Sequence, residues 1–282
     1  MRDCGTPRIT MQRYAVRLRA EGQNNQQKTK KMKKYKLTDE TIQITRNGKE
    51  VILHRIEALQ DFNGVKAGDL GGYVESEANL RHNGDCWIFG NAKVYGDALV
   101  CGDACVRYNA EVYGDALVCG DACVKYNAEV YGNAWIYGSA KVYDNAKVYD
   151  NAEVYGSAEV FGSAWIYGSA EVYDKAKVCD NAEVYGNAKV YDNAKVCGNA
   201  AVFGCAKVGD SAKVFDNAVV DGNAWVYDNA KVNGNANIRD YAMVYGNAWI
   251  YDSAEVYGSA NIYGCAKVGG TSKVYGDTVL SK

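Results

Sequence analysis

The sequence of 282 residues is poor in proline, histidine and long apolar runs. It contains one proline, Pro7, and two histidines, His54 and His82. No apolar run approaches the ~18 residues of a membrane-spanning helix, and the N-terminus lacks the apolar stretch of a signal peptide. Two histidines are also too few for a metal site that is built from three of them. These absences exclude a helical membrane span and a three-histidine metal centre.

Charge is divided between a basic front and an acidic body. The formal net charge is −2, yet the first 36 residues carry 11 Lys and Arg against 2 Asp and Glu. This balance of +9 leaves −11 for residues 37–282. A basic front can bind nucleic acid, but this one has only Tyr14 and Tyr35 as aromatic residues, so we interpret residues 1–34 as a basic, disordered leader. Because Met32 resembles a natural start, we interpret residues 1–31 as an extension outside the folded unit.

One six-residue unit fills most of the chain. An aliphatic residue stands at every sixth position from Ile88 to Val274, 32 positions in all, and "AKVYDN" at Ala146–Asn151 is a typical unit. Ala and Val, two residues apart, share one face of an extended strand. Gly-Asn, Asp-Asn or Gly-Ser then supplies a turn. An amphipathic helix is excluded, because a period of six drifts around the helix axis.

Each unit is therefore a short strand plus a corner, which cannot bury its apolar side alone. Three units close a triangle. The block Tyr95–Val112 recurs almost letter for letter as Tyr113–Val130, and the two differ only at Arg107 and Lys125. The copied block is then one whole coil of 18 residues. About ten coils at the ~4.8 Å spacing of strands make a prism on the order of 50 Å long.

This pattern resembles the hexapeptide-repeat proteins, which form left-handed parallel β-helices. The likeness covers residues 74–282 and implies the left-handed winding. Before it, "TIQITRNGKEVILHRI" at Thr41–Ile56 alternates around Asn47-Gly48, which predicts a hairpin within a capping module at 35–73. This front module resembles that of uncharacterised hexapeptide-repeat proteins of bacteria and their phages. The expected fold is all-β: a triangular, left-handed parallel β-helix with a small N-terminal hairpin cap.

Hexapeptide-repeat acyltransferases typically use a histidine as general base, beside a loop that interrupts the repeat. Here both histidines lie outside the unbroken repeat. We expect His54 to be a half-buried strand residue and His82, in "RHNGD" at Arg81–Asp85, to be a turn residue. General-base catalysis needs a pocket, and a smooth prism offers none. We therefore predict no metal, no cofactor and no catalytic residue; His82 is a weak candidate, with acetyl-CoA as cofactor, if acyl transfer holds.

Residues eighteen apart stack into columns, and two of these columns are aromatic. Such rings can stabilise the coils, or they can form a surface for protein, glycan or base stacking. A second aromatic face carries Tyr137, Tyr155, Tyr173 and Tyr191. The predicted binding surface is the longer column, which consists of Tyr95, Tyr113, Tyr131, Tyr149, Tyr167, Tyr185 and Phe203.

A column of lysines is the predicted secondary surface: Lys177, Lys195, Lys213 and Lys231. Stacked charges at ~4.8 Å would repel one another unless they were neutralised. We expect a neighbouring column to pair with them, and an anion-binding stripe is the alternative. That neighbouring column consists of Asp174, Asp192, Asp210 and Asp228.

Cysteine is abundant, with 10 residues, and several of them are eighteen apart. We expect reduced thiols in a cytoplasmic protein, because stacked disulfides would strain in-register parallel strands and no signal peptide precedes the chain. The side chains need not converge, so a zinc site is not expected. The aligned pairs are Cys101 with Cys119, Cys105 with Cys123, and Cys179 with Cys197.

The sequence favours a non-catalytic β-solenoid, encoded by a phage or prophage, which presents an aromatic surface for macromolecular interaction or self-association. The expected partner is a protein or a second copy of the chain, because the last coil has no visible cap. No membrane is expected as a partner, and nucleic acid only through the basic leader 1–36. The alternatives are an acyltransferase that uses acetyl-CoA and an acidic mimic of nucleic acid that inhibits a host enzyme.

Overall fold

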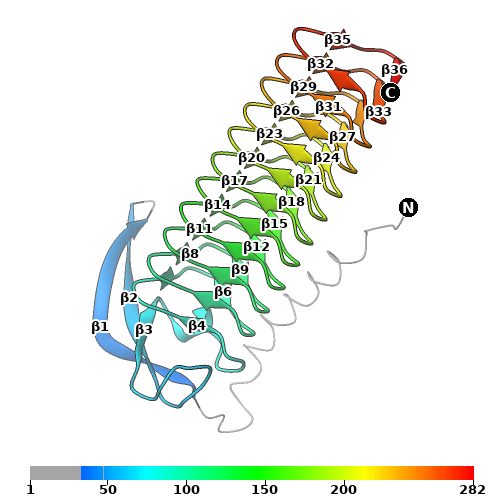
Figure 1. Ribbon diagram of the computed structural model, residues 1–282. Coiled ribbons are helices and arrows are strands. Elements are labelled where there is room, and N and C mark those ends of the chain that lie inside the picture. The colour runs from blue at the N-terminus through cyan, green and yellow to red at the C-terminus, as the bar shows by residue number, and fades with distance from the viewer. Residues whose placement is uncertain (1–32, 47) are drawn as a thin grey trace.

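The chain folds into a straight solenoid with a hairpin at its N-terminal end (Figure 1). The computed structural model describes residues 33–46 and 48–282. Except for Lys33 and Lys34, the predicted leader 1–34 lies outside the described residues. The described residues form 36 strands and one short 3-10 helix, η1 (Glu77–Asn79). None of their helices has the length and hydrophobicity that crossing a bilayer would require.

The strands of the solenoid pair in parallel with strands exactly one coil away in sequence. Val130 lies opposite Val112 on one side and Val148 on the other, so each coil consumes 18 residues. Backbone N–H groups of each coil donate to carbonyl groups of the following coil, as Glu129 N does to Ala146 O at 3.0 Å. The predicted left-handed parallel β-helix is confirmed.

Three flat sheets form the sides of the prism. Sheet 1 consists of β1 (Tyr35–Arg46), β2 (Lys49–Ala58), β3 (Leu70–Val74), β5 (Lys93–Val94), β8 (Glu111–Val112), β11 (Glu129–Val130), β14 (Lys147–Val148), β17 (Trp165–Ile166), β20 (Glu183–Val184), β23 (Ala201–Val202), β26 (Val219–Val220), β29 (Asn237–Ile238), β32 (Glu255–Val256) and β35 (Lys273–Val274). Sheet 2 consists of β6 (Leu99–Val100), β9 (Leu117–Val118), β12 (Trp135–Ile136), β15 (Glu153–Val154), β18 (Glu171–Val172), β21 (Lys189–Val190), β24 (Lys207–Val208), β27 (Trp225–Val226), β30 (Met243–Val244), β33 (Asn261–Tyr263) and β36 (Val279–Ser281). Sheet 3 consists of β4 (Trp87–Ile88), β7 (Cys105–Val106), β10 (Cys123–Val124), β13 (Lys141–Val142), β16 (Glu159–Val160), β19 (Lys177–Val178), β22 (Lys195–Val196), β25 (Lys213–Val214), β28 (Lys231–Val232), β31 (Trp249–Ile250) and β34 (Lys267–Val268).

The core is a continuous column of small apolar side chains along the prism axis. Alanine and valine of each unit point inward together, and Ala146 and Val148, for example, are completely buried. The first residue of most corners lies in the left-handed region, as Gly132 (φ 66°) and Asp150 (φ 58°) do. Glycine is favoured there because a Cβ at Gly132 would also lie 2.9 Å from the Asp150 nitrogen in the next coil. The corner chemistry predicted from the sequence is thus confirmed.

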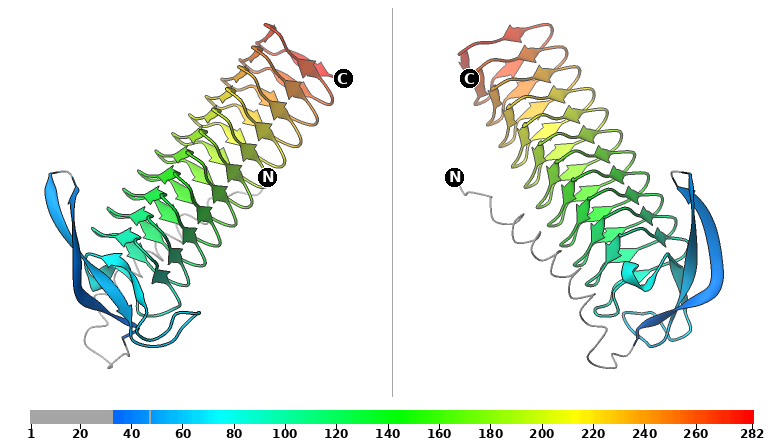
Figure 2. Two further views of the ribbon diagram at one scale, coloured as in Figure 1. Left: turned by 60° about the vertical axis from the view of Figure 1, so that its left-hand side comes forward. Right: turned by 180° about the vertical axis from the view of Figure 1, so that it is seen from behind.

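The N-terminal cap continues sheet 1 beyond the first coil. β1 and β2 pair antiparallel, as the Asn47-Gly48 signal predicts, and β2 then pairs with β3. β3 in turn runs parallel to β5 of the solenoid. The hairpin stands beside the first coils, with its tip along the prism (Figure 2), where the Arg46 guanidinium lies 4.0 Å from the centre of the Tyr113 ring.

Candidate functional site

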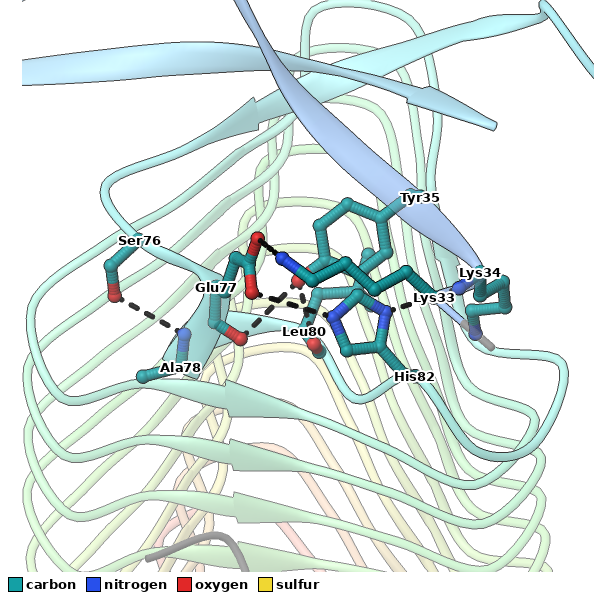
Figure 3. A network of polar contacts seen from close by, with 8 residues as sticks. All are labelled: Lys33, Lys34, Tyr35, Ser76, Glu77, Ala78, Leu80 and His82. Atoms are coloured by element: carbon teal, nitrogen blue, oxygen red, sulfur yellow. Dashed lines mark hydrogen bonds and ion pairs between the residues drawn. The ribbon is translucent and has the colours of Figure 1, made fainter. Parts of the chain in front are cut away.

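His82, the candidate general base, is wedged between the cap and the first coil. Its Nδ1 accepts a hydrogen bond from the Lys34 backbone N–H at 3.3 Å, and its ring stacks on Tyr35 with a centroid distance of 4.4 Å. Nε2 lies 3.7 Å from Glu77 Oε2. Figure 3 shows the ring between the Lys34 main chain and the Glu77 side chain. His82 therefore connects Lys34 and Tyr35, at the start of the described chain, with Glu77 of the first coil.

This geometry leaves His82 poorly suited to accept a proton. Burial lowers the pKa of His82, and the Glu77 carboxylate opposes this shift, so the ring is neutral at physiological pH. A neutral ring that accepts at Nδ1 carries its proton on Nε2. The lone pair that a general base would use is therefore already occupied by the Lys34 N–H.

The neighbouring Lys34 is the feature that sequence reasoning missed. It is 1% exposed, and its Nζ donates to Gly84 O at 3.0 Å and to Cys86 O at 2.7 Å. Because N–H groups of each coil bond to carbonyls of the following coil, the carbonyls of the first coil point toward the cap. Lys34 satisfies two of them. The sequence gives no sign that Lys34 is buried, because it lies in a basic run in which lysines such as Lys33 are exposed.

Tyr35 completes this contact between the cap and the first coil. Its hydroxyl lies 2.8 Å from Leu80 O and 3.2 Å from Glu77 O. Burial and the Glu77 charge raise the pKa of this hydroxyl well above its ordinary value, so it stays protonated and can donate. The contacts of Lys34, Tyr35 and His82 thus cover the N-terminal end of the β-helix.

His54, the other histidine, lies on β2 and takes no part in this network. Its Nδ1 is 3.3 Å from Thr38 O across the hairpin, and the residue is half-buried, as predicted. The two histidines share no hydrogen-bond partner among the described residues.

The predicted aromatic binding surface is a continuous stack on sheet 1. Neighbouring rings from Tyr95 to Phe203 lie parallel, with centroids 4.7–5.1 Å apart. Several hydroxyls donate to a glutamate of the next coil, as Tyr167 does to Glu183 at 2.9 Å. The Arg46 side chain, at the end of β1, covers the stack at Tyr113. The rings from Tyr131 to Phe203 lie farther along the prism and are half-buried.

The second aromatic face, on sheet 2, uses the same contacts. Its rings from Tyr137 to Tyr191 stack at 4.8–5.4 Å. Tyr137 donates to Glu153 at 3.1 Å, and Tyr155 to Glu171 at 3.2 Å. Both aromatic columns therefore stabilise neighbouring coils through ring stacking and through hydroxyl–carboxylate bonds.

The lysine column lies on sheet 3, but the predicted pairing with aspartates is not found among the described residues. Lys177 pairs with Glu159 at 2.8 Å instead. The aspartates are engaged elsewhere, since Asp210 Oδ2 accepts from Asp228 N at 3.2 Å and Asp228 Oδ2 from Gly246 N at 2.9 Å. An aspartate in a left-handed corner lies beside a backbone N–H of the next coil. Its carboxylate therefore accepts a hydrogen bond from that N–H and does not pair with the lysine.

The cysteines correct one expectation. Cys179 and Cys197 form a disulfide, so the prediction of reduced thiols is wrong at this pair. In-register parallel strands hold their Cα atoms 4.6 Å apart, which lies within the range that a disulfide bridges. Cys105 and Cys123 form a close pair, with sulfur atoms 2.6 Å apart. Among the described residues, Cys179, Cys197 and Asp180 are also close enough to share a metal ion, but the disulfide occupies both sulfurs.

Comparisons with known proteins add one distant relative. No family model matches the chain. A 74-residue stretch is 39% identical to a protein of Escherichia coli strain K12 named uncharacterized acetyltransferase YdcK. The match covers 24% of this chain and 23% of that protein. Together with the β-solenoid fold, it fits the predicted resemblance to hexapeptide-repeat proteins.

Proposed function

We propose that the chain is a non-catalytic β-solenoid that presents its flat sheet faces to a macromolecular partner. The observation that carries this proposal is the state of His82. This base candidate is neutral, its Nδ1 lone pair is bound to a backbone N–H, and its ring is stacked inside the cap. The coils from Ile88 to Val274 add no histidine.

The outward residues of the coils support an interaction role. They are arranged as ladders, in which each ring, lysine or amide repeats on successive coils, as Asn199 and Asn217 do through an amide hydrogen bond of 3.0 Å. Such a surface is long, flat and preorganised, so little free energy is spent on ordering it when a partner binds. A protein partner, self-association and a phage or prophage origin remain parts of this proposal.

Acyl transfer is the second candidate, and the name of the Escherichia coli relative favours it. In that case acetyl-CoA would bind near His82, and the ring would have to exchange its bond to Lys34 for one to the acceptor. The cytoplasmic location also remains a prediction. The Cys179–Cys197 disulfide is a feature that favours an oxidising compartment.

Titration calorimetry with acetyl-CoA, together with an assay for free CoA thiol in the presence of a panel of amine and alcohol acceptors, separates the two candidates. We expect no saturable heat and no thiol release above that of the His82→Ala variant. His54→Ala is the matched control, because this histidine also lies in the cap but outside the His82 network. Saturable binding and turnover that His82→Ala abolishes and His54→Ala retains would establish the acyltransferase.

A further inference from the structure

Consecutive strands of sheet 3 carry a column of exposed lysines. Lys195, Lys213 and Lys231 lie opposite one another on consecutive strands, and all three are exposed. Within the described residues, none of them forms an ion pair, whereas Lys177 below them binds Glu159. Ammonium groups on adjacent strands repel one another, so this column favours an anionic ligand.

A shallow hollow of about 440 Å³ opens beside these lysines and runs along four successive coils. Its cationic lining is Lys213, Lys231 and Lys267. Its neutral polar lining is Ser211, Asn229 and Asn247, one from the corner of each successive coil. The hollow therefore combines positive charge on one side with hydroxyl and amide groups on the other.

Trp249 supplies an aromatic surface within the hollow. Its side chain is 37% exposed, and its indole N–H donates to Asn233 Oδ1 at 2.5 Å. Lys267 Nζ lies 5.6 Å from the centre of the ring, in cation–π contact. The ring is thus held in place on two sides, which reduces the conformational entropy that a stacking ligand would have to remove.

From this arrangement we infer that the hollow binds a linear acidic oligosaccharide, with its chain along the prism axis. Carboxylate groups of successive sugars meet the lysine column, the apolar face of one sugar ring packs on Trp249, and hydroxyl groups bond to the asparagines. The inference rests on the proposed function and names the class of its partner.

The acidic corners favour a glycan, which is rich in hydroxyl groups, over a DNA strand. Asp210 and Asp228 follow one edge of the lysine column, and Asp216 and Asp252 follow the other. Their carboxylates accept hydrogen bonds from backbone N–H groups, as Asp252 does from Gly270 at 3.1 Å. They would repel the phosphates of a DNA strand, whose chain sugars have no free hydroxyl groups to donate to them. Sugar hydroxyls, by contrast, can donate to these carboxylates.

Titration calorimetry of the full chain tests this inference. The probes are an oligogalacturonate, a neutral malto-oligosaccharide of equal length, a sulfated heparin fragment and a single-stranded DNA oligonucleotide. We expect salt-sensitive binding of the oligogalacturonate and none of the neutral sugar. Binding of the heparin fragment with the same dependence on the lysines supports the site too, with sulfate in place of carboxylate.

Two pairs of substitutions locate the binding. Lys213→Gln with Lys231→Gln should weaken oligogalacturonate binding about tenfold, since each exposed charge contact contributes up to about 1 kcal/mol. The matched control is Lys147→Gln with Lys189→Gln, whose lysines pair with Glu129 and Glu171 on the other two sheets. It should change affinity less than about twofold. Circular dichroism checks that both variants are folded.

Three outcomes would overturn the inference: no binding of either acidic glycan, equal loss in both variants, or tighter binding of the DNA strand. None of these bears on the non-catalytic proposal, because the acetyl-CoA experiment tests that separately.

Discussion

The cap and the regular coils are stabilised by different kinds of contact. In the coils the main contacts recur eighteen residues later: a buried valine, a stacked ring, a corner residue with positive φ. The cap depends on contacts that occur once, such as the buried Lys34 ammonium and the Tyr35 hydroxyl on the carbonyls of the first coil.

This difference shows that the coils and the cap contribute separately to the free energy of unfolding. Each coil contacts only the two next to it, so the stack behaves as a sum of similar neighbouring terms. The cap adds a separate contribution, because its side chains donate hydrogen bonds to carbonyl groups of the first coil, which has no preceding coil to do so. A defect inside the stack should therefore separate two blocks of coils, and a defect in the cap should unfold one end.

The largest effect is expected from a charge inside the stack. Val196→Asp places an unpaired carboxylate in a completely buried position and should lower the free energy of unfolding by more than about 4 kcal/mol. Urea unfolding measures this loss. The adjacent Lys195→Gln, on the outward face, is the control and should change it by less than about 0.5 kcal/mol. Similar losses at both positions would contradict the assignment of the inward face.

A smaller and local effect is expected in the cap. Lys34→Met keeps most of the side-chain volume but leaves Gly84 O and Cys86 O without their donor, which should cost about 2–3 kcal/mol. Amide hydrogen exchange should show faster opening of the first coil, with the later coils unchanged. Lys33→Met is the control, because that side chain is exposed and loses only its surface ion pair with Glu77, which should cost less than about 1 kcal/mol. Uniformly faster exchange along the whole stack would show that the cap is no separate unit.

The tyrosine ladder should make the stack sensitive to alkali. Burial, together with the neighbouring Tyr131, raises the pKa of Tyr149 from 10.0 to about 12. The contribution of Tyr149 to the free energy of unfolding is complete below pH 10.0. It is lost as pH rises from 10.0 to about 12, because in this range the unfolded chain has released the phenol proton that the folded chain still holds. Urea midpoints at about pH 8 and about pH 11 measure the loss. Tyr149→Phe should show a smaller fall between these two values than the unchanged protein does.

The smallest effect concerns the lysine column. Since Lys213 has no acidic partner among the described residues, Lys213→Gln removes repulsion and should raise the free energy of unfolding by about 0.5 kcal/mol at low salt, and by less at high salt. Lys189→Gln, which removes a pair with Glu171, should act in the opposite direction. Destabilisation by Lys213→Gln would instead support the pairing of this lysine with aspartate that the sequence predicts.

The sequence predicted the regular part of the fold well, because its signal is repeated many times. Alternation of Ala and Val defines the inward face, and Gly or Asp marks each corner, so a misread unit would be corrected by its neighbours. The hairpin around Asn47-Gly48 was predictable for a similar local reason, since its turn residues follow a known preference.

The candidate site was less predictable, because its contacts join residues far apart in sequence and occur once. His82 was identified as a turn residue outside the repeat, but its bond to Lys34 crosses 48 positions. The aspartate column was assigned to the lysines, although corner geometry turns these carboxylates toward backbone N–H groups. The Cys179–Cys197 disulfide was rejected on expected strain, whereas the in-register strands hold the two residues at a suitable separation.

What the sequence alone determined is the coil: its length, its inward and outward faces, and the columns that follow from them. These depend on local backbone preferences and apolar periodicity, which act over a few residues and are visible in the letters. Only the tertiary structure decided which partner each outward polar group takes, and what covers the first coil. Those choices depend on direction and distance between segments, which a linear pattern does not record.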